Sequence, residues 1–112
     1  MTLLEHQQLF ARLVASLLGK VSELGLEVTL GEAYRPNETA ELYALQGKGS
    51  SQSVHPLRLA IDLHLFRDGE FLTRSEDHAV LGHWWEQQHL FCRWGGRFGD
   101  GNHYSLMWKG RA

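Results

Sequence analysis

Residues 53–63 read SVHPLRLAIDL, and a later stretch, residues 100–106, reads DGNHYSL. In both stretches, polar side chains that can bind a metal interrupt a sequence typical of a buried strand. Asp62 lies within the apolar run LAIDLHL, and a lone carboxylate is costly to bury unless a partner compensates its charge. We therefore expect the rest of the chain to bring these two stretches together around one cation.

The candidate ligands of that cation are His55, Asp62 and His103. A catalytic zinc usually takes three protein ligands from His and Asp or Glu, and it leaves a fourth position for water. The alternative is that Asp62 pairs with an arginine or faces solvent at a strand edge. Two histidines and one aspartate scattered along a chain do not decide between these interpretations.

An ordered set of motifs resembles the M15 zinc peptidases, which include D-Ala-D-Ala carboxypeptidases, dipeptidases and phage endolysins that cleave L-Ala-D-Glu bonds. The first motif of that family is S-x-H-x-x-G-x-A-x-D. Residues 53–62 match it at every named position except the glycine, where this chain has Arg58. The replacement concerns the local path of the backbone rather than the ligands.

Two further motifs lie on either side of the first. Arg35, in the triplet YRP, matches an arginine upstream in the family. WGG at residues 94–96, followed by Asp100 and His103, is similar to the family's ending W-G-G … [D/E]-x-x-H. The residue two after this histidine is often Glu or Gln in the family, whereas here it is Ser105. A side chain at that position that supports the metal ligands would therefore do so through the Ser105 hydroxyl.

The resemblance implies a zinc peptidase that hydrolyses an amide bond in peptidoglycan stem peptides, with Zn2+ held by His55, Asp62 and His103. The chain length suits the small phage endolysins that cut the L-Ala-D-Glu bond. A D,D-carboxypeptidase or dipeptidase of the same family is the near alternative. A non-catalytic wall-binding module that keeps zinc for structure is a second alternative, from another functional class.

The same resemblance gives roles to four more residues. Asp100 is the candidate general base and acid, and Arg35 would bind the substrate and stabilise the developing oxyanion. Ser53 and Trp94 are candidates for substrate binding. Each role has a structural alternative: an Asx turn for Asp100, a salt bridge with a nearby glutamate for Arg35, the end of a loop for Ser53 and core packing for Trp94.

Composition narrows the class of protein. The 112 residues predict a single domain over residues 1–112, which the resemblance implies is a zinc peptidase domain, and we expect a monomer. The formal charge of −2 includes no broad basic footprint, so nucleic acid is not an expected partner. The single cysteine, Cys92, excludes an intrachain disulfide. No apolar run approaches the roughly 20 residues that cross a bilayer, so membrane insertion is not expected.

The N-terminus also informs the expected location. It lacks a positively charged region followed by a long apolar core and a small-residue cleavage site, which are the features of a secretory signal. We therefore expect synthesis in the cytoplasm of a host bacterium without a signal peptide. Action at the cell wall would follow once the membrane is opened, as in bacteriolysis by a bacteriophage.

The pattern of apolar residues and turn signals predicts an α+β fold, an antiparallel sheet with flanking helices. The resemblance to the M15 peptidases implies the D-Ala-D-Ala peptidase and Hedgehog-like type of this fold. Thr2 and Glu5 predict a capping box, Gly25 predicts the end of the first helix, and His6 on that helix is expected to be solvated. The expected elements are helices over 2–24, 36–45 and 76–90 (the last capped by Ser75), strands over 26–30, 57–66, 70–72 and 103–108, a hairpin turn at 68–69 and a polar loop over 46–54.

Overall fold

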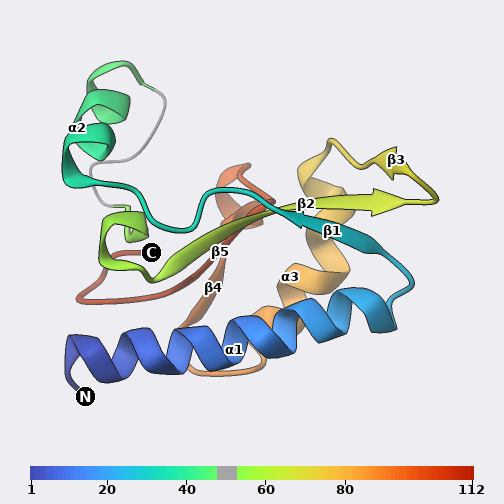
Figure 1. Cartoon of the computed structure of the whole chain (residues 1–112), viewed down its shortest axis with the longest axis horizontal. Coiled ribbons are helices and arrows are strands. Elements are labelled where there is room, and N and C mark those ends of the chain that lie inside the picture. Colours follow the sequence, from blue (N-terminus) through green and yellow to red (C-terminus); the bar gives the residue numbers. More distant parts are fainter. Residues whose placement is uncertain (48–52) are drawn as a thin grey trace.

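An antiparallel sheet of five strands organises the chain, seen in a computed structural model that describes residues 1–47 and 53–112. The predicted α+β class is confirmed (Figure 1). The sheet order is β1–β2–β5–β4, with β3 paired to β2. The elements are α1 (Leu3–Glu23), β1 (Glu27–Leu30), α2 (Asn37–Leu45), β2 (Ala60–Arg67), β3 (Glu70–Phe71), α3 (Ala79–Glu86), β4 (Cys92–Trp94) and β5 (His103–Leu106), with short 3-10 turns at His55–Leu57, Ser75–His78 and Gly95–Phe98.

One face of the sheet carries buried apolar side chains and the other carries polar ones, and the side chains of β2 alternate between the two faces. Ile61, Leu63 and Leu65 are buried in the hydrophobic core, into which the apolar sides of α1 and α3 also pack. Because successive side chains of a strand point to opposite faces, Asp62 and His64 lie on the other face. The polar residues of the site are therefore displayed on the side of the sheet opposite the core.

The first helix ends where the sequence predicts, and its capping box is present. The Thr2 hydroxyl accepts from the Glu5 backbone, and the Glu5 carboxylate accepts from the Thr2 backbone. Beyond its last residue the chain turns through Gly25, at a left-handed φ of 75°. The prediction that His6 is solvated is wrong: its ring is buried, and Nε2 contacts the Met107 backbone oxygen at 3.0 Å. The C-terminal part of the chain folds back over the start of α1 and covers this ring.

The second predicted strand starts later than expected, because residues 55–57 form a 3-10 turn before β2. Arg58 then adopts φ 57° and ψ 37°, a left-handed conformation that favours glycine. This is the position where the resembled family has glycine, so the backbone takes a glycine-like path with an arginine in place. The guanidinium lies 4.0 Å over the Tyr34 ring, a contact that offsets part of the strain.

The predicted hairpin at residues 68–69 is present. Asp68 has φ 52° and Gly69 has φ 80°, and two consecutive positive values are those of a type I′ turn. The turn leads into β3, which pairs antiparallel with the end of β2.

The predicted helix over 76–90 is shorter and interrupted. A 3-10 turn comes first, and α3 ends at Glu86. Ser75 does not cap a helix as predicted, because its hydroxyl accepts from the Gly101 backbone at 3.0 Å and so ties this turn to the loop before β5. β4 was not predicted, because its three residues are too few to show a strand periodicity.

The predicted polar loop over 46–54 falls mostly on residues 48–52, which lie outside the described residues. Among the described residues, none of the helices combines the length and apolarity that crossing a lipid bilayer requires.

Candidate metal centre

Three of the predicted site residues converge at one point. Asp62 and His103 are directly paired in the β2–β5 ladder, and His55 reaches the same point from the 3-10 turn before β2. Asp62 Oδ1 lies 3.3 Å from His55 Nε2 and 3.4 Å from His103 Nδ1. One ligand atom from each residue lies within 4.8 Å of the other two, so this group could hold a metal ion.

Backbone oxygens orient both imidazole rings. His55 Nδ1 lies 2.9 Å from the Ala33 oxygen, and His103 Nε2 lies 2.9 Å from the Ala112 oxygen. A backbone oxygen only accepts, so each of these nitrogens carries the proton that it donates. The other nitrogen of each ring therefore faces Asp62, and it can bind a metal when it carries no proton.

The environment of Asp62 indicates a need for positive charge. Its Oδ1 atom is buried and has no partner in hydrogen-bond geometry among the described residues. Burial alone would raise the pKa of this carboxyl, but the opposing effects of His103 and His55 are stronger and hold the pKa well below its usual range. The carboxylate is thus ionised, and a cation between it and the two ring nitrogens would satisfy all three groups.

His103 responds to the same carboxylate. Burial would lower the pKa of His103, but Asp62 and the Ala112 oxygen raise it above its ordinary value. A proton on His103 and a metal ion are therefore alternative ways to balance the Asp62 charge. One carboxylate with two imidazoles is the donor set of open zinc sites, so the residues present fit zinc.

These three residues lie in the wall of a cavity of about 670 Å³, which we call the main cavity. Its volume is within the range of roughly 300–1,000 Å³ that is common for ligand sites. All seven residues selected from the sequence line it: Arg35, Ser53, His55, Asp62, Trp94, Asp100 and His103.

Arg35 forms the salt bridge that was the structural alternative to its predicted role in substrate binding, and that role stays a prediction. Its guanidinium contacts Glu32 Oε1 at 2.5 Å and lies 5.2 Å from the Tyr43 ring centre. Its side chain is only 11% exposed, yet it forms part of the wall of the main cavity. The salt bridge is therefore present, and it also holds the arginine at the edge of the site.

Asp100 is the most exposed of the candidate residues. Its side chain is 62% accessible, and Oδ2 lies 4.0 Å from His103 Nδ1. The Asp100 backbone oxygen accepts from the His103 amide at 3.1 Å, which closes a turn that aims both side chains at one region. The Asp100 backbone oxygen also lies close to Gly95, which only a glycine allows, because a Cβ at that position would lie 2.3 Å from this oxygen.

Ser53 and Trp94 line the cavity but have structural contacts as well. The Ser53 hydroxyl accepts from the His55 amide at 3.2 Å, which supports the turn that carries this ligand. Trp94 is 7% exposed, and its Nε1 donates to the Gly101 oxygen at 2.7 Å. A Cβ at Gly82 would lie 2.1 Å from the Trp94 ring, so the indole is tightly enclosed. Their roles in substrate binding stay predictions.

Sequence reasoning missed several groups around the site. The Ala33 and Ala112 oxygens carry no sequence signal, because every residue has a backbone carbonyl. The Arg111 guanidinium donates to the Ser53 backbone oxygen at 2.7 Å and also lines the cavity. The Ser105 hydroxyl, considered as a possible partner of the ligands, is buried without a hydrogen-bond partner among the described residues. The Ala112 oxygen takes the place beside His103 instead.

Comparison with known proteins places the fold. No protein-family model matches the chain, and no curated protein matches it either. The crystal structure of the Serratia marcescens L-Ala D-Glu endopeptidase ChiX is similar, with a TM-score of 0.68 and 17% sequence identity. The match covers 88% of this chain and 77% of that chain. At this identity the similarity shows a shared fold, and this chain therefore has the fold of a known L-Ala D-Glu endopeptidase.

Proposed function

We propose that this chain is a zinc-dependent peptidase that hydrolyses an amide bond in peptidoglycan stem peptides, as an L-Ala-D-Glu endopeptidase of the phage endolysin type. The observation that carries the proposal is the buried Oδ1 of Asp62, which lies between two oriented histidine nitrogens and has no partner in hydrogen-bond geometry among the described residues. It lies in the wall of a cavity that is also lined by Arg35 and Asp100. The fold shared with an L-Ala D-Glu endopeptidase supports the reaction class and the substrate.

His55, Asp62 and His103 would hold the zinc ion. Zinc at these ligands would supply a Lewis acid that polarises an amide carbonyl and makes water more acidic near neutral pH. The protein keeps the two rings in the correct orientation through the Ala33 and Ala112 oxygens. The surrounding walls position the peptide and restrict access of bulk water.

Asp100 would move the proton of the reaction. Its carboxylate is accessible from the main cavity and lies beside His103, so it can accept a proton from the attacking water. The same group can then donate that proton to the amine that leaves when the C–N bond breaks. Its exposed side chain suits a group that must reach two different atoms in one cycle.

Arg35 would bind the substrate and stabilise negative charge on the scissile carbonyl oxygen. A guanidinium forms strong charge-assisted hydrogen bonds with anionic oxygen, and such bonds gain strength as charge develops. Glu32 holds the guanidinium in place at the cavity wall, and Tyr43 lies beside its face. A substrate oxygen would need only to share this group with Glu32.

The number of ligands favours catalysis over a structural metal. Structural zinc sites are usually closed by four protein ligands, whereas catalytic sites keep one position open. Among the described residues, the candidate group consists of three side chains and faces a cavity. A wall-binding module with structural zinc is therefore the weaker interpretation, and a D,D-carboxypeptidase remains the near alternative within the same reaction class.

Mass spectrometry of purified peptidoglycan after digestion would test the proposal. We expect new fragments with a free L-Ala carboxyl and a free D-Glu amine, and we expect a chelator to abolish them until zinc is added. New D-Ala ends would indicate a carboxypeptidase instead. Wall binding without any cleavage would indicate a binding module.

Asp100→Ala is the informative variant in this experiment. The peptidase should keep stoichiometric zinc but lose about 10²- to 10⁴-fold in turnover. Glu70→Gln, an exposed carboxylate in β3 away from the cavity, is the matched control and should keep full activity. Unchanged turnover in Asp100→Ala would remove the proposed role of this residue.

The proposed setting is a host bacterium in which the protein is made in the cytoplasm and reaches the wall after the membrane opens. Expression inside bacteria should then leave the cells intact. Permeabilising the inner membrane should cause rapid loss of culture turbidity, and the Asp100→Ala variant should not. Lysis without permeabilisation would contradict this setting.

A further inference from the structure

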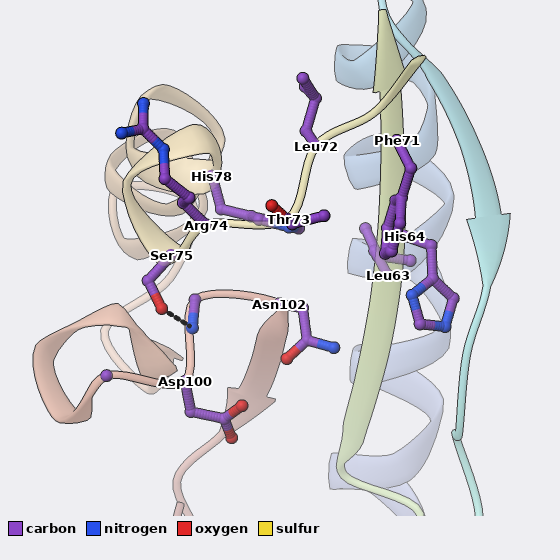
Figure 2. A pocket seen from close by; sticks show the side chains of 12 residues that line it. Leu63, His64, Phe71, Leu72, Thr73, Arg74, Ser75, His78, Asp100 and Asn102 are labelled. Carbon is purple, nitrogen blue, oxygen red and sulfur yellow. Dashed lines mark hydrogen bonds between the residues drawn. The ribbon is translucent and has the colours of Figure 1, made fainter. Parts of the chain in front are cut away.

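A second cavity of about 270 Å³ lies next to the main cavity and shares two lining residues with it, Asp100 and Asn102. We call it the side cavity; Thr73, His64 and His78 are among its other walls (Figure 2). The two cavities therefore adjoin the same turn, which starts at Asp100. The side cavity is smaller than the roughly 300–1,000 Å³ of pockets for whole ligands, so it suits about one amino-acid residue.

The two cavities differ in charge. Among the described residues, three arginines (Arg35, Arg93 and Arg111) and two aspartates (Asp62 and Asp100) line the main cavity. One arginine, Arg74, and one aspartate, Asp100, line the side cavity. Figure 2 shows the Arg74 guanidinium pointing away from Asn102, and it lies 3.3 Å from Glu76 at an exposed position. Among the described residues, a carboxylate in the side cavity would therefore meet Asp100 with no arginine or lysine side chain pointing inward to balance it.

The side cavity offers neutral hydrogen-bonding groups instead. Leu63 donates its backbone amide to the Asn102 oxygen at 2.9 Å, which fixes the Asn102 backbone against β2. Figure 2 shows the Asn102 side chain projecting towards β2 and His64. Its amide forms no hydrogen bond to any other described residue, so both its donor and its acceptor are open to a ligand. An amide of this kind pairs well with a peptide group.

We propose that the two cavities bind opposite sides of the scissile bond and that charge sets the direction of the peptide. The acidic glutamyl side, with its free carboxylate, lies in the main cavity near Arg111. The neutral side that precedes it lies in the side cavity, where the Asn102 amide binds its peptide group and Thr73 limits its size. This inference rests on the proposed function, and it adds the direction and the selectivity of binding.

A direct test uses a reduced-amide analogue of the stem peptide, which cannot be hydrolysed, with a nitroxide label at one end. With the label on the N-terminal side, we expect the backbone NMR signals of Thr73 and Asn102 to broaden. With the label on the C-terminal side, we expect the signals of Arg93 and Arg111 to broaden. The reverse pattern, or equal broadening at both places, would overturn the proposal.

A kinetic test compares two substrates, one with a free glutamyl α-carboxylate and one with the α-carboxamide. Arg111→Gln keeps a donor for the Ser53 oxygen but loses the charge, so the preference for the carboxylate should fall about tenfold. Arg74→Gln is the matched control in the other cavity and should leave the preference unchanged. An effect of Arg74→Gln, or none in Arg111→Gln, would contradict the proposed direction.

The role of the side cavity is tested with peptides that differ in the number of residues before the scissile bond. Asn102→Ala and Thr73→Trp should raise the KM of peptides extended before the scissile bond, with little effect on the shortest substrate that is cleaved. Equal effects on short and extended peptides would overturn the role of this cavity. If the unmodified protein cleaves none of these peptides, the proposed function itself is wrong, which separates the two failures.

Discussion

Asp62 and His103 face each other across the β2–β5 ladder, with Asp62 Oδ1 3.4 Å from His103 Nδ1. Directly paired strand residues share one face of the sheet, so the backbone register alone brings this carboxylate and this imidazole together. His55 needs only the short turn before β2 to join them. The site is therefore built on a rigid element rather than on a flexible loop, which suits precise metal binding.

We predict that Asp62→Asn lowers zinc affinity by more than about 100-fold, because loss of a charged ligand should exceed the 10- to 100-fold effect of losing a ligand's supporting partner. Competition with a coloured chelator measures this affinity. His64→Gln changes a polar residue two positions along the same strand and face, and it should bind zinc normally. Equal affinities in Asp62→Asn and the unmodified protein would exclude Asp62 as a ligand.

Removal of residues 110–112 should weaken zinc binding by about 10- to 100-fold. The Ala112 oxygen accepts from His103 Nε2, and this bond holds the ring so that Nδ1 faces Asp62. Lys109→Gly keeps residues 110–112 and is compatible with the left-handed φ of 49° at that position, so it serves as the control. A truncated chain with unchanged zinc affinity would show that the ring is oriented without this bond.

Stability should fall in acid because of His78. Burial lowers the pKa of this imidazole to about 4 from an ordinary 6.5, although Asp77 opposes the effect, and Nδ1 lies 2.7 Å from the Tyr104 hydroxyl. Between these pH values the unfolded chain binds a proton here that the folded chain does not. The free energy of unfolding should therefore drop by about 1.4 kcal/mol for each pH unit as the pH falls through this window.

Urea unfolding at pH 7 and pH 4.5 measures this dependence. In His78→Asn the side chain cannot be protonated, so the difference between the two pH values should shrink by about 2–3 kcal/mol. Any remaining acid sensitivity then belongs to other groups. An undiminished difference would show that His78 is protonated in the folded protein.

Gly82→Ala should destabilise the fold, because a Cβ there would lie 2.1 Å from the Trp94 ring. The indole is buried and its Nε1 is bonded to Gly101, so it has little room to move. We expect a loss of about 1–3 kcal/mol in the free energy of unfolding.

Gly19→Ala is the matched control for this variant. Gly19 lies within α1, and a Cβ there meets no atom within 4 Å. This substitution should raise stability by about 0.5–1 kcal/mol, because alanine is the better helix former. Thermal unfolding of both variants would check the two opposite signs, and a neutral Gly82→Ala would show that Trp94 can shift.

Arg58→Gly should retain zinc affinity, because glycine adopts the left-handed conformation of this turn without strain. Arg58→Val should lose about 1–2 kcal/mol in the free energy of unfolding, since it keeps the strain and removes the contact with Tyr34. Chelator competition and urea unfolding would measure the two quantities. A loss of zinc binding in Arg58→Gly would mean that the arginine side chain itself orients His55.

Features that depend on neighbouring residues were predictable from sequence. The capping box of Thr2 and Glu5 and the turn at Asp68 and Gly69 follow from local hydrogen bonding and local backbone preference. The apolar run around Asp62 indicated a buried strand with an expensive charge. Local chemistry therefore identified the α+β class and made Asp62 a candidate metal ligand, whereas the resemblance to the M15 peptidases selected the full set of residues that meet at the site.

Features that depend on distant residues were not predictable. His6 is buried because the segment after β5 covers the start of α1. The three residues of β4 form a strand because they pair with β5, which is distant in the sequence. The helix expected over 76–90 starts as a 3-10 turn, in which Ser75 bonds to Gly101 instead of capping the helix. In each case a contact across the fold outweighs a weak local preference.

The amino-acid sequence by itself determined which side chains could bind a metal, because ligand chemistry belongs to the residue type. Only the tertiary structure decided that Asp62 and His103 share a register, which ring nitrogens are free, and how two cavities meet at Asn102. Those features depend on distances between segments and on backbone carbonyls. The order of the residues shows neither these distances nor these carbonyl contacts, because every residue carries the same carbonyl and the distances arise only when the chain folds.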